Sequence, residues 1–166
     1  NLTGELTCIE ITAKNVVLDC KGHRITGKMR SGTGILLSGA DGTIVKNCQV
    51  YGFGDDILLV DTNNAFITNN FVNGTLNGIT LVNSSGNTIS NNNASRLSSG
   101  YGLSLQDSNS NTIASNHFEY TEIGLFFNNS DFNLIVNNTA FDNIFSGAWF
   151  FNSFENTVKH NSFRTT

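Results

Sequence analysis

Residues 78–94 read GITLVNSSGNTISNNNA, and this stretch decides the fold of the chain. Its first four residues follow the pattern glycine, apolar, any residue, apolar. A second apolar position, Ile89, comes ten residues after Ile79, and Asn92 follows three residues later. Short runs with alternating apolar residues are typical of β-strands, because successive side chains of a strand point to opposite faces.

The pattern recurs every 22 to 24 residues along nearly the whole chain. The first apolar positions are Ile35, Ile57, Ile79, Leu103, Leu125 and Ala148, and the positions ten residues later are Val45, Ile67, Ile89, Ile113, Ile135 and Val158. Repeats of this size cannot bury an apolar face alone and must stack on copies of themselves. The sequence therefore predicts an all-β fold, a single-stranded right-handed parallel β-helix with about seven coils of about 22 residues.

The inward face of this β-helix is predicted from the same register. One turn of each coil places a polar residue in a column: Cys48, Asn70, Asn92, Asn116, Asn138 and Asn161. Stacked asparagines can form a ladder, because each amide carries both donors and an acceptor. We expect four of these asparagines (Asn70, Asn92, Asn116, Asn138) to point inward with Ile57, Leu59, Ile67, Ile79, Leu81, Ile89, Leu103, Leu105, Ile113, Leu125, Phe127 and Ile135.

The chain reads as one domain over residues 1–166, with an irregular coil at 1–33 and regular coils at 34–166. In the first coil we expect Val17 to take the second apolar slot and Cys20 the ladder slot, directly beneath Cys48. Length variation between the repeats falls in the connection to the next glycine, where solenoids place their insertions.

Composition and charge exclude several classes of protein. Charged residues are 13% of the chain, the net charge is −4, and there is no proline. A net negative chain is a poor ligand for phosphates, so we expect no nucleic-acid partner. No apolar run is long enough for a membrane span. The chain begins with Asn1 rather than Met, which fits a processed secreted or cell-surface protein or an excised piece.

Three segments resemble a known family: residues 16–23 (VVLDCKGH), 87–92 (NTISNN) and 111–113 (NTI). They look like the parallel β-helix repeats of the pectate-lyase-like superfamily. The nearest branch is that of carbohydrate-binding and sugar-hydrolase proteins, the copper-processing NosD type and archaeal surface proteins. The resemblance covers nearly the whole chain and implies the fold, whereas function varies widely within such superfamilies.

Gly54-Asp55-Asp56 is similar to the paired-aspartate motif of polygalacturonase-type hydrolases, in which two carboxylates flank the scissile bond. The Asn-Thr-Asp, Gly-His-Gly and Arg-Ile-Lys segments of those enzymes are missing. We therefore interpret the two aspartates as a solvated turn and assign no catalytic residue. The three histidines (His23, His117, His160) are too dispersed for metal-ligand spacing. No metal site and no cofactor are predicted.

Outward positions between the inward residues form a second column that ends in large aromatic side chains: Leu36, Leu58, Thr80, Ser104, Phe126 and Trp149. With Phe151 nearby, Phe126 and Trp149 form a candidate contact surface for a protein or for sugar rings. Cover by a loop over 142–146 is the alternative.

The three cysteines allow more than one state. Aligning Cys20 with Cys48 in adjacent coils places their Cα atoms about 5 Å apart, within the range for a disulfide. The family resemblance implies a rival bridge from Cys8 to Cys20, and free thiols are the third possibility. Six N-glycosylation sequons occur, at Asn1, Asn73, Asn83, Asn93, Asn128 and Asn137.

These features favour an extracellular or cell-surface structural β-solenoid, not an enzyme. We expect a scaffold or filament subunit whose copies stack head to tail, because neither end of the repeat array has a cap. The alternatives are a carbohydrate-binding module and a degenerate polysaccharide hydrolase or lyase that uses Asp55 and Asp56.

Overall fold

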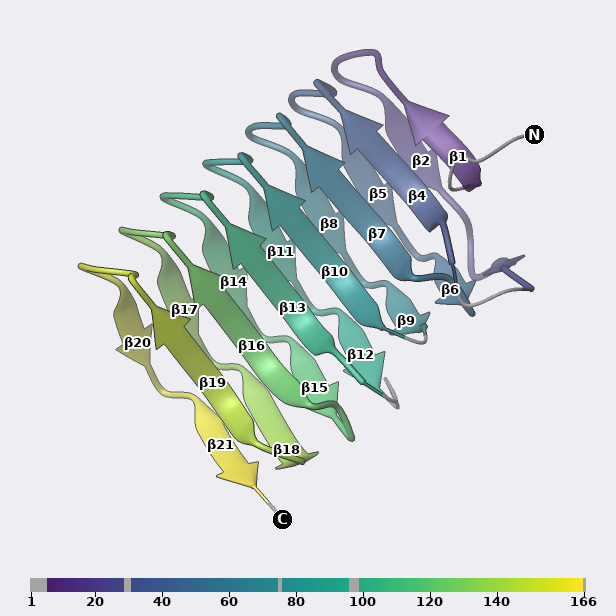
Figure 1. Cartoon of the computed structure of the whole chain (residues 1–166). Coiled ribbons are helices and arrows are strands. Elements are labelled where there is room, and N and C mark those ends of the chain that lie inside the picture. Colours follow the sequence, from purple (N-terminus) through teal and green to yellow (C-terminus); the bar gives the residue numbers. More distant parts are fainter. Residues whose placement is uncertain (1–5, 29–30, 75, 96–98, 166) are drawn as a thin grey trace.

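A computed structural model describes residues 6–28, 31–74, 76–95 and 99–165. Three parallel sheets of seven strands run along a stack of coils, and the two ends of the chain lie at opposite ends of the stack (Figure 1). Each coil contributes one strand to each sheet, and every strand pairs in parallel with the equivalent strand of the next coil. The predicted parallel β-helix of seven coils is confirmed.

The sheets are called A, B and C in the order in which the chain visits them. Sheet A contains β1 (Thr7–Ile11), β4 (Thr33–Ser38), β7 (Asp55–Val60), β10 (Asn77–Val82), β13 (Tyr101–Gln106), β16 (Ile123–Asn128) and β19 (Ser146–Phe151). Sheet B contains β2 (Val17–Asp19), β5 (Ile44–Lys46), β8 (Phe66–Thr68), β11 (Thr88–Ser90), β14 (Thr112–Ala114), β17 (Leu134–Val136) and β20 (Thr157–Lys159). Sheet C contains β3 (Arg24–Thr26), β6 (Gln49–Tyr51), β9 (Phe71–Asn73), β12 (Asn93–Ser95), β15 (His117–Glu119), β18 (Thr139–Asn143) and β21 (Ser162–Thr165).

The core fills the space between the three sheets. All twelve apolar side chains predicted to point inward are fully buried, and the four predicted ladder asparagines are at most 2% exposed. Registers such as Ile57↔Ile79 and Ile67↔Ile89 place like residues above one another, so each coil buries its apolar residues against its neighbours. The alternation seen in the sequence therefore marks the inward face correctly.

The asparagine column forms the expected ladder. The backbone N–H of Asn70 donates to Oδ1 of Asn92 at 3.0 Å, and the N–H of Asn92 donates to Oδ1 of Asn116 at 2.9 Å. Each amide Nδ2 also donates to a carbonyl of an earlier coil, as from Asn116 to Ile89 at 2.8 Å. The ladder thus satisfies buried backbone groups at a turn where no strand partner is available.

Two further ladders were not predicted from the sequence. One is made by the hydroxyls of Thr62, Ser84, Ser108, Ser130 and Ser153, each of which accepts a backbone N–H from the preceding coil. The other is made by the amides of Asn87, Asn111, Asn133 and Asn156. Together they serve the turn between sheets A and B in the way the first ladder serves the turn between sheets B and C.

The expectation for Val17 is wrong. Leu18 pairs with Val45 and is half-buried, whereas Val17 pairs with Ile44 on the outer face and is 59% exposed. A shift of one residue along a strand exchanges the two faces. The first coil also has two more residues than the second between sheets B and C, since Asp19 pairs with Lys46 and Arg24 pairs with Gln49.

The five glycines that open sheet A strands, Gly34, Gly78, Gly102, Gly124 and Gly147, all have a steric role. A Cβ atom at Gly78 would lie 2.7 Å from the carbonyl oxygen of Gly102, and one at Gly124 would lie 2.5 Å from that of Gly147. At these glycines the neighbouring coil leaves no room for a Cβ atom. In the coil of β7, Asp56 takes the place of this glycine. The missing side chain of Gly74 leaves the room for its carboxyl group.

No helix of the described ranges is long and apolar enough to cross a bilayer.

Candidate functional site

The structure brings the acidic pair and the aromatic column onto sheet A. Asp55 and Asn77 are register partners at the start of their strands, and Tyr101 follows in the same column. The next outward column holds Leu58, Thr80, Ser104, Phe126 and Trp149. We call Asp55, Asn77, Thr80, Ser104, Tyr101, Phe126 and Trp149 the sheet A strip.

Asp55 forms the polar end of the sheet A strip. Its Oδ1 accepts a hydrogen bond from Thr80 Oγ1 at 2.6 Å and another from Asn77 Nδ2 at 3.0 Å. Two donors from the neighbouring coil hold the carboxylate against the sheet, and both bind the same oxygen. No residue of the described ranges bonds to the second oxygen, Oδ2. Asn77 also uses its own Oδ1 to accept the N–H of Tyr101 at 3.2 Å, so the column is ordered across three coils.

Asp56 points to the other side of β7 and is fully buried. Burial, with a smaller effect of the Asp55 carboxylate, raises the pKa of Asp56 to about 8, against the opposing effect of the Phe53 N–H. A Cβ atom at Gly74 would lie 2.8 Å from either carboxyl oxygen, so Gly74 provides the room for this side chain. Asp56 is therefore a neutral carboxylic acid at neutral pH.

The two aspartates cannot serve one glycosidic bond. A two-carboxylate hydrolase needs both groups on the same side of the substrate, about 5 to 10 Å apart across the scissile bond. Here Asp55 lies on the outer face and Asp56 lies in the core. The interpretation of both residues as one solvated turn is also wrong, because Asp56 has no contact with solvent.

The aromatic end of the sheet A strip is a continuous stack. The rings of Tyr101 and Phe126 are stacked with centroids 4.6 Å apart, and Phe126 meets Trp149 edge to face at 5.9 Å. Trp149 and Phe151 are each 50% exposed. The loop over 142–146 therefore leaves them open to solvent.

Two small residues separate the polar end from the aromatic end. Thr80 and Ser104 are on the outer face, yet they are 5% and 1% exposed. Ser104 Oγ has no hydrogen-bond partner among the described residues. The small side chains lie low between Leu58 and Phe126, which are the larger members of the same column.

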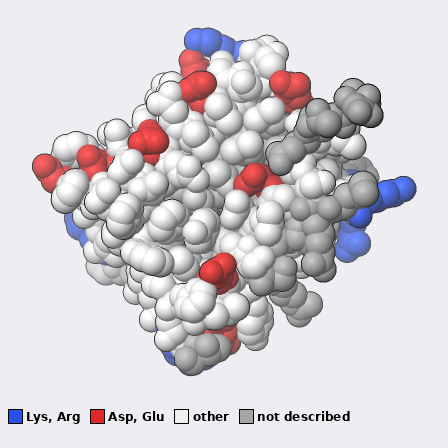
Figure 2. Space-filling view, in the orientation of Figure 1, with Lys and Arg blue, Asp and Glu red and all other residues white. Residues whose placement is uncertain are grey.

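Charge on this face is of one sign. The seven sheet A strands contain Glu10, Asp55 and Asp56 but no Lys or Arg. Figure 2, which views the molecule from the side of sheet A, shows a mostly uncharged surface with scattered acidic residues, and the basic residues lie at its margins. A polyanion would meet no cation on the strands of this face.

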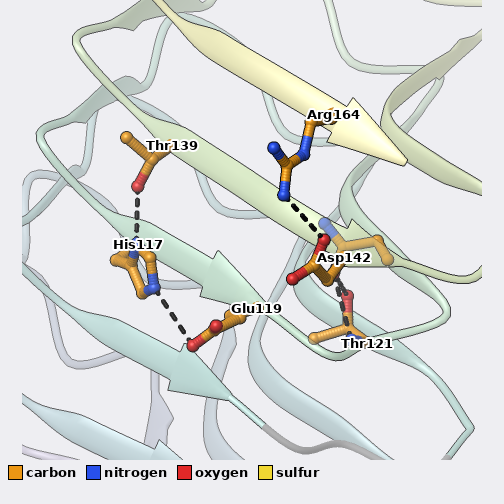
Figure 3. A network of polar contacts seen from close by, with 7 residues as sticks. His117, Glu119, Thr121, Thr139, Asp142 and Arg164 are labelled. Atoms are coloured by element: carbon orange, nitrogen blue, oxygen red, sulfur yellow. Dashed lines mark hydrogen bonds and ion pairs between the residues drawn. The ribbon is translucent and has the colours of Figure 1, made fainter. Parts of the chain in front are cut away.

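Sheet C carries a separate polar network (Figure 3). His117 Nδ1 lies 2.6 Å from Thr139 Oγ1, and its Nε2 lies 3.4 Å from Glu119 Oε2. The order hydroxyl, imidazole, carboxylate is that of nucleophilic hydrolases, which also need N–H donors for the oxyanion. The N–H groups of Thr139 and Ser162 already donate to carbonyls of the preceding coil, so they form no oxyanion hole.

The structure joins Cys20 and Cys48 in a disulfide with their Cα atoms 4.8 Å apart, and Cys8 is free and exposed. Of the sequons, Asn83 and Asn137 are exposed and Asn73, Asn93 and Asn128 are half-buried. Asn1 lies outside the described residues. Glycosylation remains a prediction.

Sequence reasoning missed Asn77, Thr80 and Tyr101 as partners of Asp55. A signal was present, because Asp55, Asn77 and Tyr101 all come directly before the position that opens the inward pattern of their repeats. Thr80 belongs to the outward column, but its position in the sequence does not connect it with Asp55, which pairs with Asn77 three residues before Thr80. The contact between these columns exists only once adjacent coils are placed in register.

Solved structures with the same fold include two crystal structures of the periplasmic alginate epimerase AlgG. A double mutant of that protein matches with a TM-score of 0.76 and 24% identity over 86% of this chain and 34% of that chain. A single mutant matches with a TM-score of 0.66 and 22% identity over 86% of this chain and 32% of that one. The chain thus spans about a third of AlgG, and the likeness shows the fold. No curated protein sequence matches the chain.

A family model described as "Periplasmic copper-binding protein (NosD)" matches residues 5–149. The periplasmic description agrees with the location outside the cytoplasm that the sequence predicts. Copper sites use clustered imidazole, thiolate or thioether ligands. Within the described ranges no three His, Cys, Asp or Glu side chains lie close enough to share a metal ion, and two of the three cysteines form the disulfide. These residues do not fit a copper site, but the match covers most of the chain, and the chain belongs to the NosD family of parallel β-helix proteins.

Proposed function

We propose that the chain is a glycan-binding β-helix that acts outside the cytoplasm, and that the sheet A strip binds an uncharged polysaccharide. One observation carries the proposal. The hydrogen-bonded carboxylate of Asp55 and the exposed aromatic stack that ends in Trp149 lie on the same face of sheet A.

Each end of the sheet A strip suits a different part of a sugar. Aromatic rings bind the apolar face of a sugar ring while leaving its hydroxyls in water. Trp149 and Phe126 supply such a surface. Carboxylate and amide groups hydrogen-bond to sugar hydroxyls, and Asp55 keeps an oxygen free for this because Thr80 and Asn77 both bind the other one.

The spacing of the coils suits an extended chain of sugars. Parallel strands lie about 4.8 Å apart, which is close to the length of one sugar unit. Asp55 and Trp149 lie four coils apart, since β7, β10, β13, β16 and β19 are consecutive in sheet A. A ligand that contacts both ends is therefore an oligosaccharide that runs along the stack.

The charge of the face selects against acidic polymers. A uronate chain would bring carboxylates toward Asp55 and Glu10 with no Lys or Arg on these strands to compensate. Like charges that approach in this way oppose binding. An uncharged polysaccharide has no such cost.

A glycan array with the intact chain and with Trp149→Ala and Asp55→Asn variants tests the proposal. We expect the intact chain to bind a set of uncharged oligosaccharides and each variant to lose most of that binding. Phe66→Ala is the matched control, because Phe66 is a 47% exposed aromatic on sheet B, away from the strip. Unchanged binding in the Trp149→Ala variant would overturn the proposal.

A second candidate function is a scaffold whose copies associate. It is favoured by apolar side chains on the last two coils that a monomer leaves in water: Ile144 is 60%, Phe145 66% and Phe154 67% exposed. Exposed apolar patches of this kind are typical of protein contacts. Head-to-tail stacking of copies is the form of association that the sequence predicts.

A further inference from the structure

A second concave site lies at the other end of the stack, at the turn between sheets B and C. It is a wide-open surface cavity of about 410 Å³ that spans the first three coils, and it is lined by Lys21, Gly22, Asn47, Cys48, Gln49, Asn69 and Phe71. None of these residues belongs to the sheet A strip. The cavity is therefore independent of the proposed function.

The irregular first coil builds one wall of this cavity. The turn there is two residues longer than in the second coil and includes Lys21 and Gly22, both with positive φ. The Cys20–Cys48 disulfide attaches this longer turn to the second coil. The Gly22 N–H also donates to the carbonyl of Asn47 at 2.8 Å. The wall is held by a covalent bond and a hydrogen bond.

The polar groups of the cavity have hydrogen-bonding capacity left for a ligand. Gln49 uses Oε1 to accept from Arg24 Nε at 3.2 Å and from the Tyr51 hydroxyl at 3.3 Å, so its amide N–H groups stay free. Asn47 donates through Nδ2 to Asp19 at 2.9 Å, which leaves its Oδ1 free. These hydrogen bonds hold both side chains in place, and within the part of the chain that the structure describes the Gln49 amide N–H groups and Asn47 Oδ1 have no partner.

Phe71 provides an apolar wall beside these amides. Its ring lies 5.7 Å from that of Tyr51, and the Arg24 guanidinium lies over the Tyr51 ring at 4.8 Å. An aromatic face next to amide groups is the combination that binds a sugar ring.

The charge around the cavity is positive, although the net charge of the chain is −4. Five basic residues lie in the described part of the first two coils: Lys14, Lys21, Arg24, Lys28 and Lys46. Lys14 and Lys46 form ion pairs with Asp41 and Asp19. Lys21 and Arg24 have no carboxylate partner among the described residues, and Asp19 is already held by Asn47 and the Lys21 N–H.

We propose that this cavity binds an acidic sugar, with the ring against Phe71, the hydroxyls on Gln49 and Asn47, and the carboxylate toward Lys21 and Arg24. An uncharged sugar would use the wall and the amides but leave both cations unpaired. The two ends of the molecule then bind sugars of different charge: uncharged units on the sheet A strip and an acidic unit at the disulfide end.

Calorimetric titration of the disulfide-bonded chain with a trisaccharide of galacturonic acid tests this inference. We expect binding that weakens as salt is added, since the contact is between opposite charges. Lys21→Gln and Phe71→Ala should each weaken it by about tenfold or more, which corresponds to loss of one charge-assisted or stacking contact. The uncharged galactose trisaccharide should bind at least about tenfold more weakly than the acidic one.

Two controls separate this site from other contributions. Lys14→Gln removes an exposed cation of the same end that lies outside the cavity, and it should leave the affinity unchanged. Trp149→Ala should also leave it unchanged, so failure of the sheet A proposal would not affect this result. Equal affinity of the Lys21→Gln variant and the intact chain, equal binding of the two trisaccharides, or no binding of the acidic one would each overturn the inference.

Discussion

Asp55 and Asp56 are consecutive in the sequence, yet their carboxyl groups lie on opposite sides of β7. Asp55 bonds to Thr80 and Asn77 on the outer face, and Asp56 is fully buried beside Gly74. Strict alternation from the inward Ile57 and Leu59 would place Asp55 inside and Asp56 outside. The start of β7 departs from that period, because Asp56 and Ile57 are both fully buried. The separation gives the two acids different chemistry: one is a hydrogen-bonded carboxylate on the outer face and the other a neutral group of the core.

The burial of Asp56 predicts a specific dependence of stability on pH. Its pKa is about 8 in the folded chain, against an ordinary value of 3.8. Between these values the unfolded carboxyl is ionised while the folded one keeps its proton, so the free energy of unfolding falls as pH rises from about 4 to about 8. The slope is up to about 1.4 kcal/mol per pH unit for this group.

The Asp56→Asn variant should lose this slope and be the more stable form at pH 8. Urea denaturation of both proteins between pH 5 and pH 9 measures the difference, and Asp55→Asn is the control that should keep the slope. A constant difference between Asp56→Asn and the intact chain across this range would contradict the prediction.

The inward register predicts a contrast between adjacent positions of β11. Ile89→Ala should cost about 2 to 5 kcal/mol of unfolding free energy, because it leaves a cavity among fully buried side chains. Ser90→Ala should be close to neutral, because Ser90 is on the outer face and makes one hydroxyl contact, to Thr68. Chemical denaturation would show equal losses at both positions if the register were wrong.

The asparagine ladder predicts a second severe position. Asn116 accepts at Oδ1 from Asn92 and donates through Nδ2 to Ile89 and Asn138. Asn116→Ala leaves buried partners unsatisfied and should cost at least about 2 kcal/mol. Asn109→Ala is a suitable comparison, because Asn109 is exposed and water can replace the one hydrogen bond that its side chain accepts, from the Asp131 N–H, so its loss should be much smaller. Similar losses for the two variants, measured by thermal and urea unfolding, would count against a structural ladder.

The cysteines predict one bridge and one free thiol. Peptide mapping without reductant should recover Cys20 linked to Cys48 and Cys8 as a free thiol. Reduction should lower the free energy of unfolding by about 2 to 4 kcal/mol, because the bridge closes a loop between two coils. Recovery of a Cys8–Cys20 peptide would instead support the rival bridge that the family resemblance implies.

Self-association is the last prediction. Light scattering on the 166-residue chain should show concentration-dependent growth of species larger than a monomer. Replacing Phe145 and Phe154 together by serine should suppress this growth, since both are largely exposed aromatics on the last two coils. A chain that stays monomeric at high concentration would remove the scaffold hypothesis and leave glycan binding unaffected.

Much of the fold was predictable because a solenoid is built from local rules. Each repeat carries its own strand pattern, and stacking identical repeats needs no knowledge of distant segments. Ile67 and Asn92 could be placed inward from spacing alone. Val17 could not be placed correctly, because the first coil departs from the repeat and its two faces differ by a shift of a single residue.

The candidate sites were predictable only in part. Trp149 and Asp55 were each visible in the sequence as unusual residues. Contacts between different coils decide three features that the sequence does not show. These are the common face of Trp149 and Asp55, the hydrogen bond from Thr80 to Asp55, and the cavity at Lys21 and Phe71. Such contacts join residues more than twenty positions apart, and they form only when the stack sets the relative position of the coils.

The sequence by itself determined the number of coils, the inward apolar columns and one asparagine ladder, because these follow from a repeated pattern of side chains in a strand. Only the tertiary structure decided that Asp56 is buried in a position that other coils fill with glycine, that Asp55 lies on the same face as the aromatic stack, and that a disulfide and a longer turn build a wall of the cavity at Lys21. The physical reason is that a repeat specifies the direction of each side chain within its own coil. Burial, charge and unused hydrogen-bonding capacity depend on the neighbours that adjacent coils supply.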